Sequence, residues 1–160
     1  MGKIYSKERN GAFMENIIVK DLNDFLSDLN IFYRKLQNYH WNVCGKDFFV
    51  LHSKLEEYYD EVNKQIDEIA EHILILGGQP LGTVKDYLDI STIKEAENKK
   101  IKSAEIYNNL LSDFEELNKK AIEIKEEAEI EKDYATSSLI DEYILDYGKI
   151  IWMLKHVTSE

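Results

Sequence analysis

Apolar side chains recur every three to four residues along four long stretches of this 160-residue chain. In the first stretch, about 19–44, they stand at Leu22, Phe25, Leu26, Leu29, Phe32, Leu36, Tyr39 and Val43. This spacing places them on one face of an α-helix. The same periodicity predicts three further helices, over about 47–76, 101–128 and 133–157.

Glycine and proline mark where these helices end. Gly45 is a natural stop for the first helix, and Gly77-Gly78, with Pro80 beyond, closes the second. The connections within the first and last helix pairs are short, so each pair is expected to be an antiparallel hairpin. Residues 79–100 form a long crossover, in which we expect a short helix after Ser91. The predicted fold class is therefore all-α, a four-helix bundle of the ferritin-like form with a long central crossover.

The polar residues 1–15 are expected to form a flexible N-terminal tail, and residues 16–160 a single domain. No apolar run is long enough for a transmembrane helix, and no secretory signal stands at the N-terminus. The single cysteine, Cys44, excludes an intrachain disulfide and fits a reducing compartment. We expect a soluble cytoplasmic protein. The net charge of −11 argues against nucleic-acid binding and favours cations, although acidity also serves solubility.

Histidines and carboxylates repeat at helical spacing in the second predicted helix. His52 and Glu56 stand at i and i+4, and Asp67 and Glu71 repeat that spacing. On a helical wheel with His52 at zero, these four lie between 0 and about 100°, beside an apolar face at about 260–320°. The far side, expected to face solvent, holds Glu57, Glu61, Glu68 and His72. A single such pair is typical of a solvated helix surface, whereas two on one stripe favour a metal site.

The two pairs are too far apart for one helix to bring them to one ion. Glu56 and Asp67 are separated by about 16 Å along the axis. A twofold axis near residues 61–62 would lay His52 and Glu56 of one subunit against Asp67 and Glu71 of its mate, giving two equivalent sites. His40, late on the first helix, could complete each site. This donor mixture suits Fe(II), and manganese or zinc is tolerated.

An ordinary di-iron site inside one bundle is not expected, because such bundles carry Glu-x-x-His on two helices. The residue three positions before each histidine is here Gln37, Phe49, Ile69 or Met153.

Four segments give the chain a specific resemblance to a known family. They are Tyr39-His40-Trp41-Asn42-Val43-x-Gly45-x-x-Phe48, Leu51-His52, Asp67-x-x-Ala70-Glu71 and Leu76-Gly77-Gly78-x-Pro80-x-Gly82-Thr83, with Trp152-Met153-Leu154 near the C-terminus. From about Asp21 onward the sequence resembles the Dps family, ferritin-like miniferritins first named as DNA-binding proteins from starved cells.

The resemblance implies a hollow homo-oligomeric shell of twelve subunits that protects against oxidative stress. It implies a ferroxidase, an oxidoreductase acting on metal ions, that oxidises Fe(II) with hydrogen peroxide in preference to oxygen and stores ferric mineral. The family's iron ligands carry over onto His40, His52 and Glu56 of one subunit and Asp67 and Glu71 of its mate. Trp41, beside His40, is expected either to intercept stray oxidising equivalents or to pack at the interface.

Two positions depart from the family. Aspartate is usual where this chain has Glu56, and the extra methylene of glutamate is expected to shift one iron position. Many members line a threefold iron-entry pore with acids around the position of Thr136, where this chain has Tyr134 and Ser138, with Glu129, Glu131 and Asp133 upstream.

Two other classes of function compete with iron storage. The first is a DNA-binding protein that protects the nucleoid, with iron oxidation secondary. Its tail would offer only Lys3, Lys7 and Arg9 against the acidic body, so DNA binding is expected to be weak or absent. The second is a structural shell with inactive sites, against which the complete ligand set argues.

Overall fold

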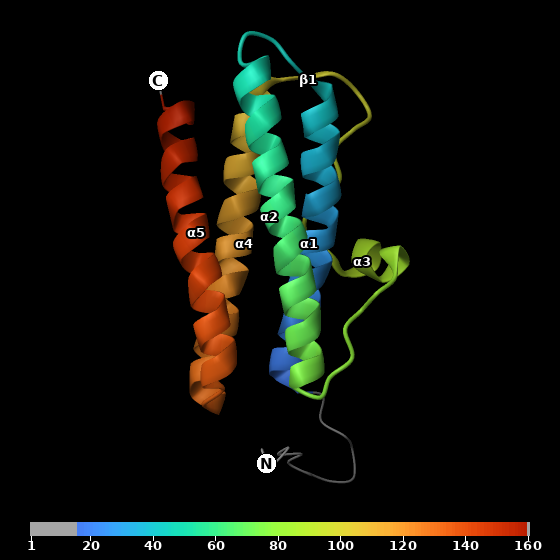
Figure 1. Ribbon diagram of the computed structural model, residues 1–160, viewed down its shortest axis with the longest axis vertical. Helices are drawn as coiled ribbons and strands as arrows, with labels where there is room; N and C mark the ends of the chain where they lie inside the picture. The colour runs from blue at the N-terminus through green and yellow to red at the C-terminus, as the bar shows by residue number, and fades with distance from the viewer. Residues whose placement is uncertain (1–15, 160) are drawn as a thin grey trace.

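Four long helices lie side by side along the long axis of the molecule in the computed structural model (Figure 1). The structure describes residues 16–159. The helices are α1 (Ile17–Asn42), α2 (Phe48–Ile75), α4 (Ser103–Glu131) and α5 (Tyr134–Thr158), with a short α3 (Val84–Ile90) in the crossover. The predicted all-α, ferritin-like four-helix class is confirmed. The prediction of a tail over 1–15 lies outside the described residues. Within 16–159, no helix is long and apolar enough to cross a membrane.

Side-chain caps and left-handed residues set the helix ends. The Asn16 carboxamide oxygen accepts hydrogen bonds from the backbone N–H groups of Ile18 and Val19 at the start of α1. Gly77, with φ of 79°, turns the chain out of α2. At the next residue, Gly78, a Cβ atom would lie 2.6 Å from a methyl carbon of Val19. Glycine there lets the end of α2 approach the start of α1 closely.

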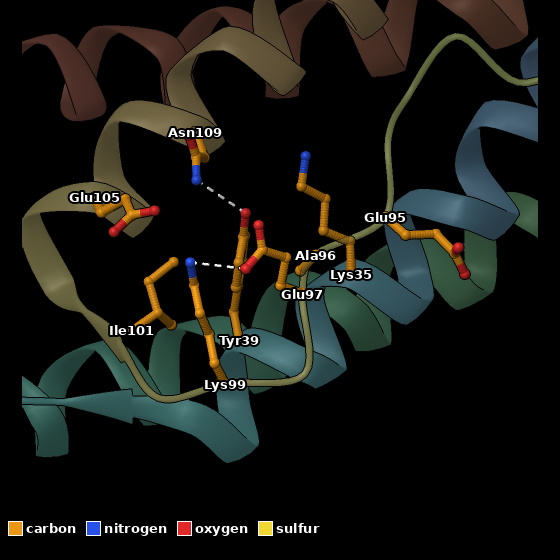
Figure 2. Close-up of a pocket in the computed structure, with 9 residues that line it drawn as sticks. All are labelled: Lys35, Tyr39, Glu95, Ala96, Glu97, Lys99, Ile101, Glu105 and Asn109. Carbon is orange, nitrogen blue, oxygen red and sulfur yellow. Dashed lines mark hydrogen bonds and ion pairs between the residues drawn. The ribbon is translucent and has the colours of Figure 1, made fainter.

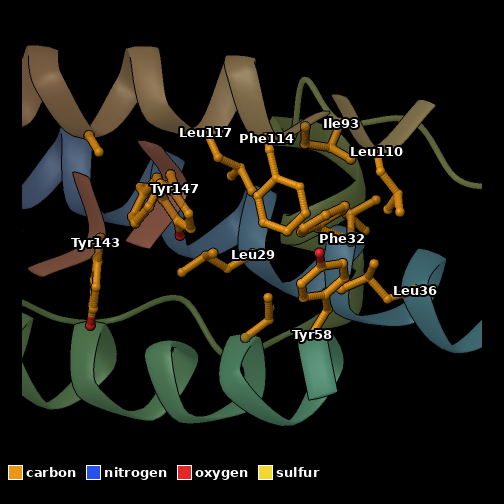
Figure 3. Close-up of a cluster of buried hydrophobic side chains, with 14 of the residues drawn as sticks. Leu29, Phe32, Leu36, Tyr58, Ile93, Leu110, Phe114, Leu117, Tyr143 and Tyr147 are labelled. Carbon is orange, nitrogen blue, oxygen red and sulfur yellow. The ribbon is translucent and has the colours of Figure 1, made fainter. Parts of the chain in front are cut away.

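The core lies between the two hairpins, α1–α2 and α4–α5 (Figure 3). The rings of Phe32 and Phe114 meet edge to face with centroids 5.0 Å apart. Tyr147 is buried, and its hydroxyl donates a 2.7 Å hydrogen bond to the Gln65 side chain. The aliphatic part of this core includes Leu29, Leu36, Leu110 and Leu117. Burial of these side chains on facing helices fixes the relative rotation of the two hairpins.

The short helix of the crossover lies before Ser91, so the expectation that it follows Ser91 was wrong. It begins at Thr83, whose hydroxyl oxygen accepts a hydrogen bond from the Asp86 N–H. Residues 91–100 contain no helix or strand. They are held to α1 because the fully buried Asp28 carboxylate accepts from the Ser91 hydroxyl and the Thr92 N–H, each at 2.8 Å. Lys120 of α4 forms an ion pair with the same carboxylate. The crossover is thus anchored to both α1 and α4.

A short parallel pairing joins the α1–α2 connection to the end of the long crossover. β1 (Val43–Cys44) pairs with β2 (Ile101–Lys102), in the register Val43 with Ile101. For this reason α1 ends at Asn42 and α4 begins at Ser103, two residues inside the predicted bounds. The Cys44 thiol donates to the Ile101 carbonyl at 3.4 Å. The pairing ties the α1–α2 connection to the start of α4.

A polar cavity of about 180 Å³ lies under the crossover, between α1 and α4 (Figure 2). Asn109 donates a 3.0 Å hydrogen bond to the Tyr39 hydroxyl there, and Lys99 pairs with Glu97 at 2.8 Å. Lys35, which also lines it, pairs with the Asp113 carboxylate at 2.6 Å. None of the five predicted iron ligands lines this cavity.

Candidate metal site

His40 and His52 face each other across the first hairpin. His40 stands two residues before the end of α1 and His52 four residues after the start of α2. Antiparallel packing of the two helices brings them to the same level. Their imidazole rings stack, with centroids 3.7 Å apart and an interplanar angle of 16°. The structure therefore brings together two of the predicted ligands from different helices.

Reciprocal hydrogen bonds hold this pair. Nδ1 of His40 lies 2.7 Å from the backbone oxygen of His52, and Nδ1 of His52 lies 2.8 Å from the backbone oxygen of His40. A carbonyl oxygen only accepts, so each Nδ1 carries the proton and donates it. In each neutral ring the lone pair then belongs to Nε2. Fixing the tautomer through the other ring nitrogen is how proteins prepare histidine for a metal ion.

The other three predicted ligands lie further along α2. Glu56, Asp67 and Glu71 are exposed, and His52 is half-buried. Glu56 and Asp67, the nearest residues of the two pairs, are separated by about 16 Å along the helix axis. Among residues 16–159 of one chain, no group of three or more His, Cys, Asp or Glu side chains could hold a metal ion. The five predicted ligands therefore do not come together within residues 16–159 of one subunit.

Large apolar side chains stand on the same stripe of α2 as the ligands. Phe49 is 82% exposed and Leu74 is 56% exposed. Taking His52 as zero, they lie at about 60° and about 40°, within the ligand arc. Our sequence reasoning missed them, although an apolar residue at each end of a polar stripe is a readable signal. Single exposed apolar side chains are ordinary on a protein surface, so these two matter here only because both lie on the stripe of the predicted ligands.

The expectation that His72 and Glu68 face solvent was wrong. His72 is buried, and its Nε2 lies 2.7 Å from the Thr136 hydroxyl oxygen of α5. Burial lowers the pKa of His72, while the charge of Asp133 opposes this shift. Glu68, half-buried, accepts a 2.6 Å hydrogen bond from the Tyr143 hydroxyl of α5. The buried arc of α2 is wider than the apolar positions indicate, because α5 covers a second side of the helix.

Two of the three acids at the α4–α5 turn already form hydrogen bonds or ion pairs with other residues of the chain. Asp133 caps α5 by accepting a 3.0 Å hydrogen bond from the Thr136 N–H. Glu129 accepts from the Ser137 hydroxyl and pairs with Lys125. Glu131 is exposed.

Trp41, at the end of α1 beside His40, has 61% of its surface exposed. Within one chain it is therefore not a core residue. Both roles expected for it, intercepting oxidising equivalents and packing at a subunit interface, stay predictions.

Comparisons with known proteins agree with this architecture. The family of ferritin-like domains matches residues 19–160. DNA protection during starvation protein 2 of Bacillus anthracis is 37% identical over 145 residues, 89% of this chain and 97% of that protein. A Dps protein from Bacillus brevis superposes with a TM-score of 0.87 at 33% identity, over 91% of this chain and 100% of that one.

A third relative links the fold to metal chemistry. The Dps protein from Vibrio cholerae, described as a member of a broad superfamily of ferritin-like diiron-carboxylate proteins, superposes with a TM-score of 0.86 at 35% identity. That match covers 89% of each chain. From these matches, and from the four-helix bundle with its one long crossover, we conclude that this chain belongs to the Dps family of ferritin-like proteins.

Proposed function

We propose that this protein is an iron-storage miniferritin and a ferroxidase, which oxidises Fe(II) at sites shared by two subunits. The observation that carries this proposal is the reciprocally hydrogen-bonded pair His40 and His52. It presents two imidazole nitrogens as ligands beside a carboxylate stripe. Imidazole and carboxylate together suit Fe(II), which is here the substrate rather than a permanent cofactor.

The register of α2 supports a shared site. His52 and Glu71 are equidistant from a point between Glu61 and Val62, and so are Glu56 and Asp67. The exposed apolar residues Phe49 and Leu74 share that midpoint. A twofold axis there, with the α2 helices antiparallel, sets each ligand pair of one subunit opposite the other pair of its mate. It also sets Phe49 against the partner's Leu74. The contact is self-complementary, as a twofold interface requires.

His40, His52 and Glu56 of one subunit would then hold iron together with Asp67 and Glu71 of the other. Hydrogen peroxide, the oxidant we propose, takes one electron from each of two Fe(II) ions. The products are two Fe(III) ions and two hydroxide ions. Since both electrons reach peroxide from paired iron, no hydroxyl radical is released. Iron removal and protection from oxidative stress are on this proposal one reaction.

Our proposal of a hollow shell is based on membership of the Dps family, since one chain does not reveal it. We propose that twelve subunits enclose a cavity that stores the ferric product, in the cytoplasm. DNA protection is part of the name of the Bacillus anthracis relative. For the present chain we assign protection to iron oxidation, because a net charge of −11 on each subunit repels DNA phosphates. Direct DNA binding remains the alternative.

The test is anaerobic oxidation of Fe(II) after addition of hydrogen peroxide, followed by ferric absorbance. The variant His52→Ala/Glu56→Ala removes one exposed or half-exposed ligand pair and is expected to assemble normally. We expect fast oxidation by the wild type and at least a hundredfold slower initial oxidation by the variant. Loss of a metal ligand costs more than the roughly 10–100-fold that follows from changing a residue that only orients a ligand. A variant of unchanged size that oxidises Fe(II) at the wild-type rate would refute the proposal.

A further inference from the structure

An aromatic column encloses the two imidazole rings. Phe48 stacks on His52, with centroids 5.0 Å apart and an interplanar angle of 22°. His52 stacks on His40 at 3.7 Å, and Tyr59 meets His40 at 5.4 Å with its ring almost perpendicular, at 88°. Four rings from two helices thus form one continuous series, with an aromatic ring at each end.

We propose that Phe48 and Tyr59 are positioning residues, which hold the two imidazoles in the orientation that presents Nε2 to the metal ion. This inference rests on the proposed function and assigns two further residues to its site. Phe48 has no atom that binds iron, and Tyr59 contacts His40 through its ring. Both act through the histidines they contact.

The hydrogen bonds alone leave each imidazole ring free to tilt. A bond from Nδ1 to a backbone oxygen fixes one edge of the imidazole, but the ring can still tilt about that bond. A neighbouring ring on each outer side opposes the tilt, and an aromatic contact of this kind contributes beyond simple burial. Because metal ions need ligand nitrogens at a set direction and distance, restricting the tilt before binding increases affinity.

The chain positions explain why these two residues reach the histidines. Phe48 is the first residue of α2 and stands one turn before His52, on the same side of the helix. Tyr59 stands two turns after His52, beside Tyr33 of α1, and its ring still reaches that of His40 at 5.4 Å. Both are half-buried, so their rings pack against the histidines while the site stays open to solvent.

Tyr59 also contacts Tyr33 of α1, edge to face at 6.0 Å. The Tyr33 hydroxyl accepts a 3.1 Å hydrogen bond from the Gln37 side chain. Tyr59 therefore packs against Tyr33, whose own position is fixed by the hydrogen bond from Gln37. In contrast, Phe49 is the outer neighbour of Phe48 and is open to solvent in one chain.

The experiment is a titration of the apo, assembled protein with Co(II), which reports its own ligand geometry through visible absorbance and needs no turnover. The variants are Phe48→Leu, Tyr59→Leu and Tyr59→Phe, with His52→Ala as the ligand control. Phe25→Leu is the matched core control, because Phe25 is buried and stacks on Tyr143 away from the histidines. We expect Phe48→Leu and Tyr59→Leu to weaken Co(II) binding about tenfold and to change the visible spectrum. Tyr59→Phe keeps the ring and should bind as the wild type does.

The outcomes separate this inference from the proposed function. Wild-type affinity and spectrum in both leucine variants, with binding lost in His52→Ala, would overturn the positioning role and leave the ferroxidase site standing. An equal loss in Phe25→Leu would also overturn it, because the effect would then be general destabilisation. Equal binding by the wild type and His52→Ala would refute the metal site itself.

Discussion

Two inactive variants should restore activity when they are assembled together. The first, His52→Ala/Glu56→Ala, lacks one ligand pair of α2, and the second, Asp67→Ala/Glu71→Ala, lacks the other. The pairs lie about 16 Å apart on one helix, so on the proposed function each subunit contributes one pair to each of two different sites. Each variant alone breaks both sites of its dimer. In a mixed dimer, one site receives both intact pairs and the other receives neither.

The expected recovery can be calculated from this arrangement. Random assembly from equal amounts of the two variants makes about half of the dimers mixed, and half of their sites are intact, so activity should reach about a quarter of the wild-type value. The assay is peroxide-driven Fe(II) oxidation by co-expressed, differently tagged subunits, with mixing verified by mass spectrometry. Values near zero in verified mixed assemblies would refute the shared site.

A matched control uses a variant from the same half-site. His40→Ala should not complement His52→Ala/Glu56→Ala, because all three ligands are assigned to one subunit. No intact site then forms in any dimer. Recovery of activity in this mixture would move His40 to the other half of the site.

Three further results are expected. Burial raises the pKa of Tyr39 and of Tyr58 to about 12, so only about a tenth of each should be phenolate in the folded protein at pH 11. Stability against urea should fall as pH rises from about 10, where tyrosine in the unfolded chain loses its proton. Stability that is independent of pH between 10 and 12 would contradict this. Asp28→Ala leaves Lys120 without its buried partner and should lower the free energy of unfolding by about 3 kcal/mol in urea titrations, whereas a change below about 1 kcal/mol would show that the crossover does not depend on this carboxylate. At low salt the intact protein should leave DNA unshifted in a gel, and a shift abolished by deleting residues 1–13 would instead favour the DNA-binding alternative.

The helices were predictable from local pattern, and their ends less so. The second helix was expected over 47–76 and is Phe48–Ile75, because glycine at its end is a strong local signal. The short crossover helix was misplaced, although Thr83 with Asp86 three residues later is a capping signal in the sequence. The anchoring of the chain at Ser91 and the β1–β2 pairing depend on partners more than fifty residues away, which periodicity does not reveal.

Part of the candidate site was likewise predictable from the sequence, and part depends on how the helices pack. Helical spacing predicts the ligand stripe and a site shared by two subunits, and both stay predictions. The half-burial of His52 and the exposure of Glu56 agree with the wheel. The backbone bonds between His40 and His52 depend on the relative level of two helices, which sequence spacing does not give. The burial of His72 was missed because its partner, Thr136, belongs to α5.

Main-chain anchoring of the histidines has a consequence for how such a site can evolve and be rebuilt. The two carbonyl groups that fix the tautomers belong to the backbone and survive any change of side chain at neighbouring positions. Sequence can therefore drift around the hairpin, provided that the two helices keep their level. If the proposed site is correct, the α1–α2 hairpin carries the orientation of its own histidine ligands. Grafting it onto another antiparallel helix pair would transfer that orientation with only two histidines and their flanking rings.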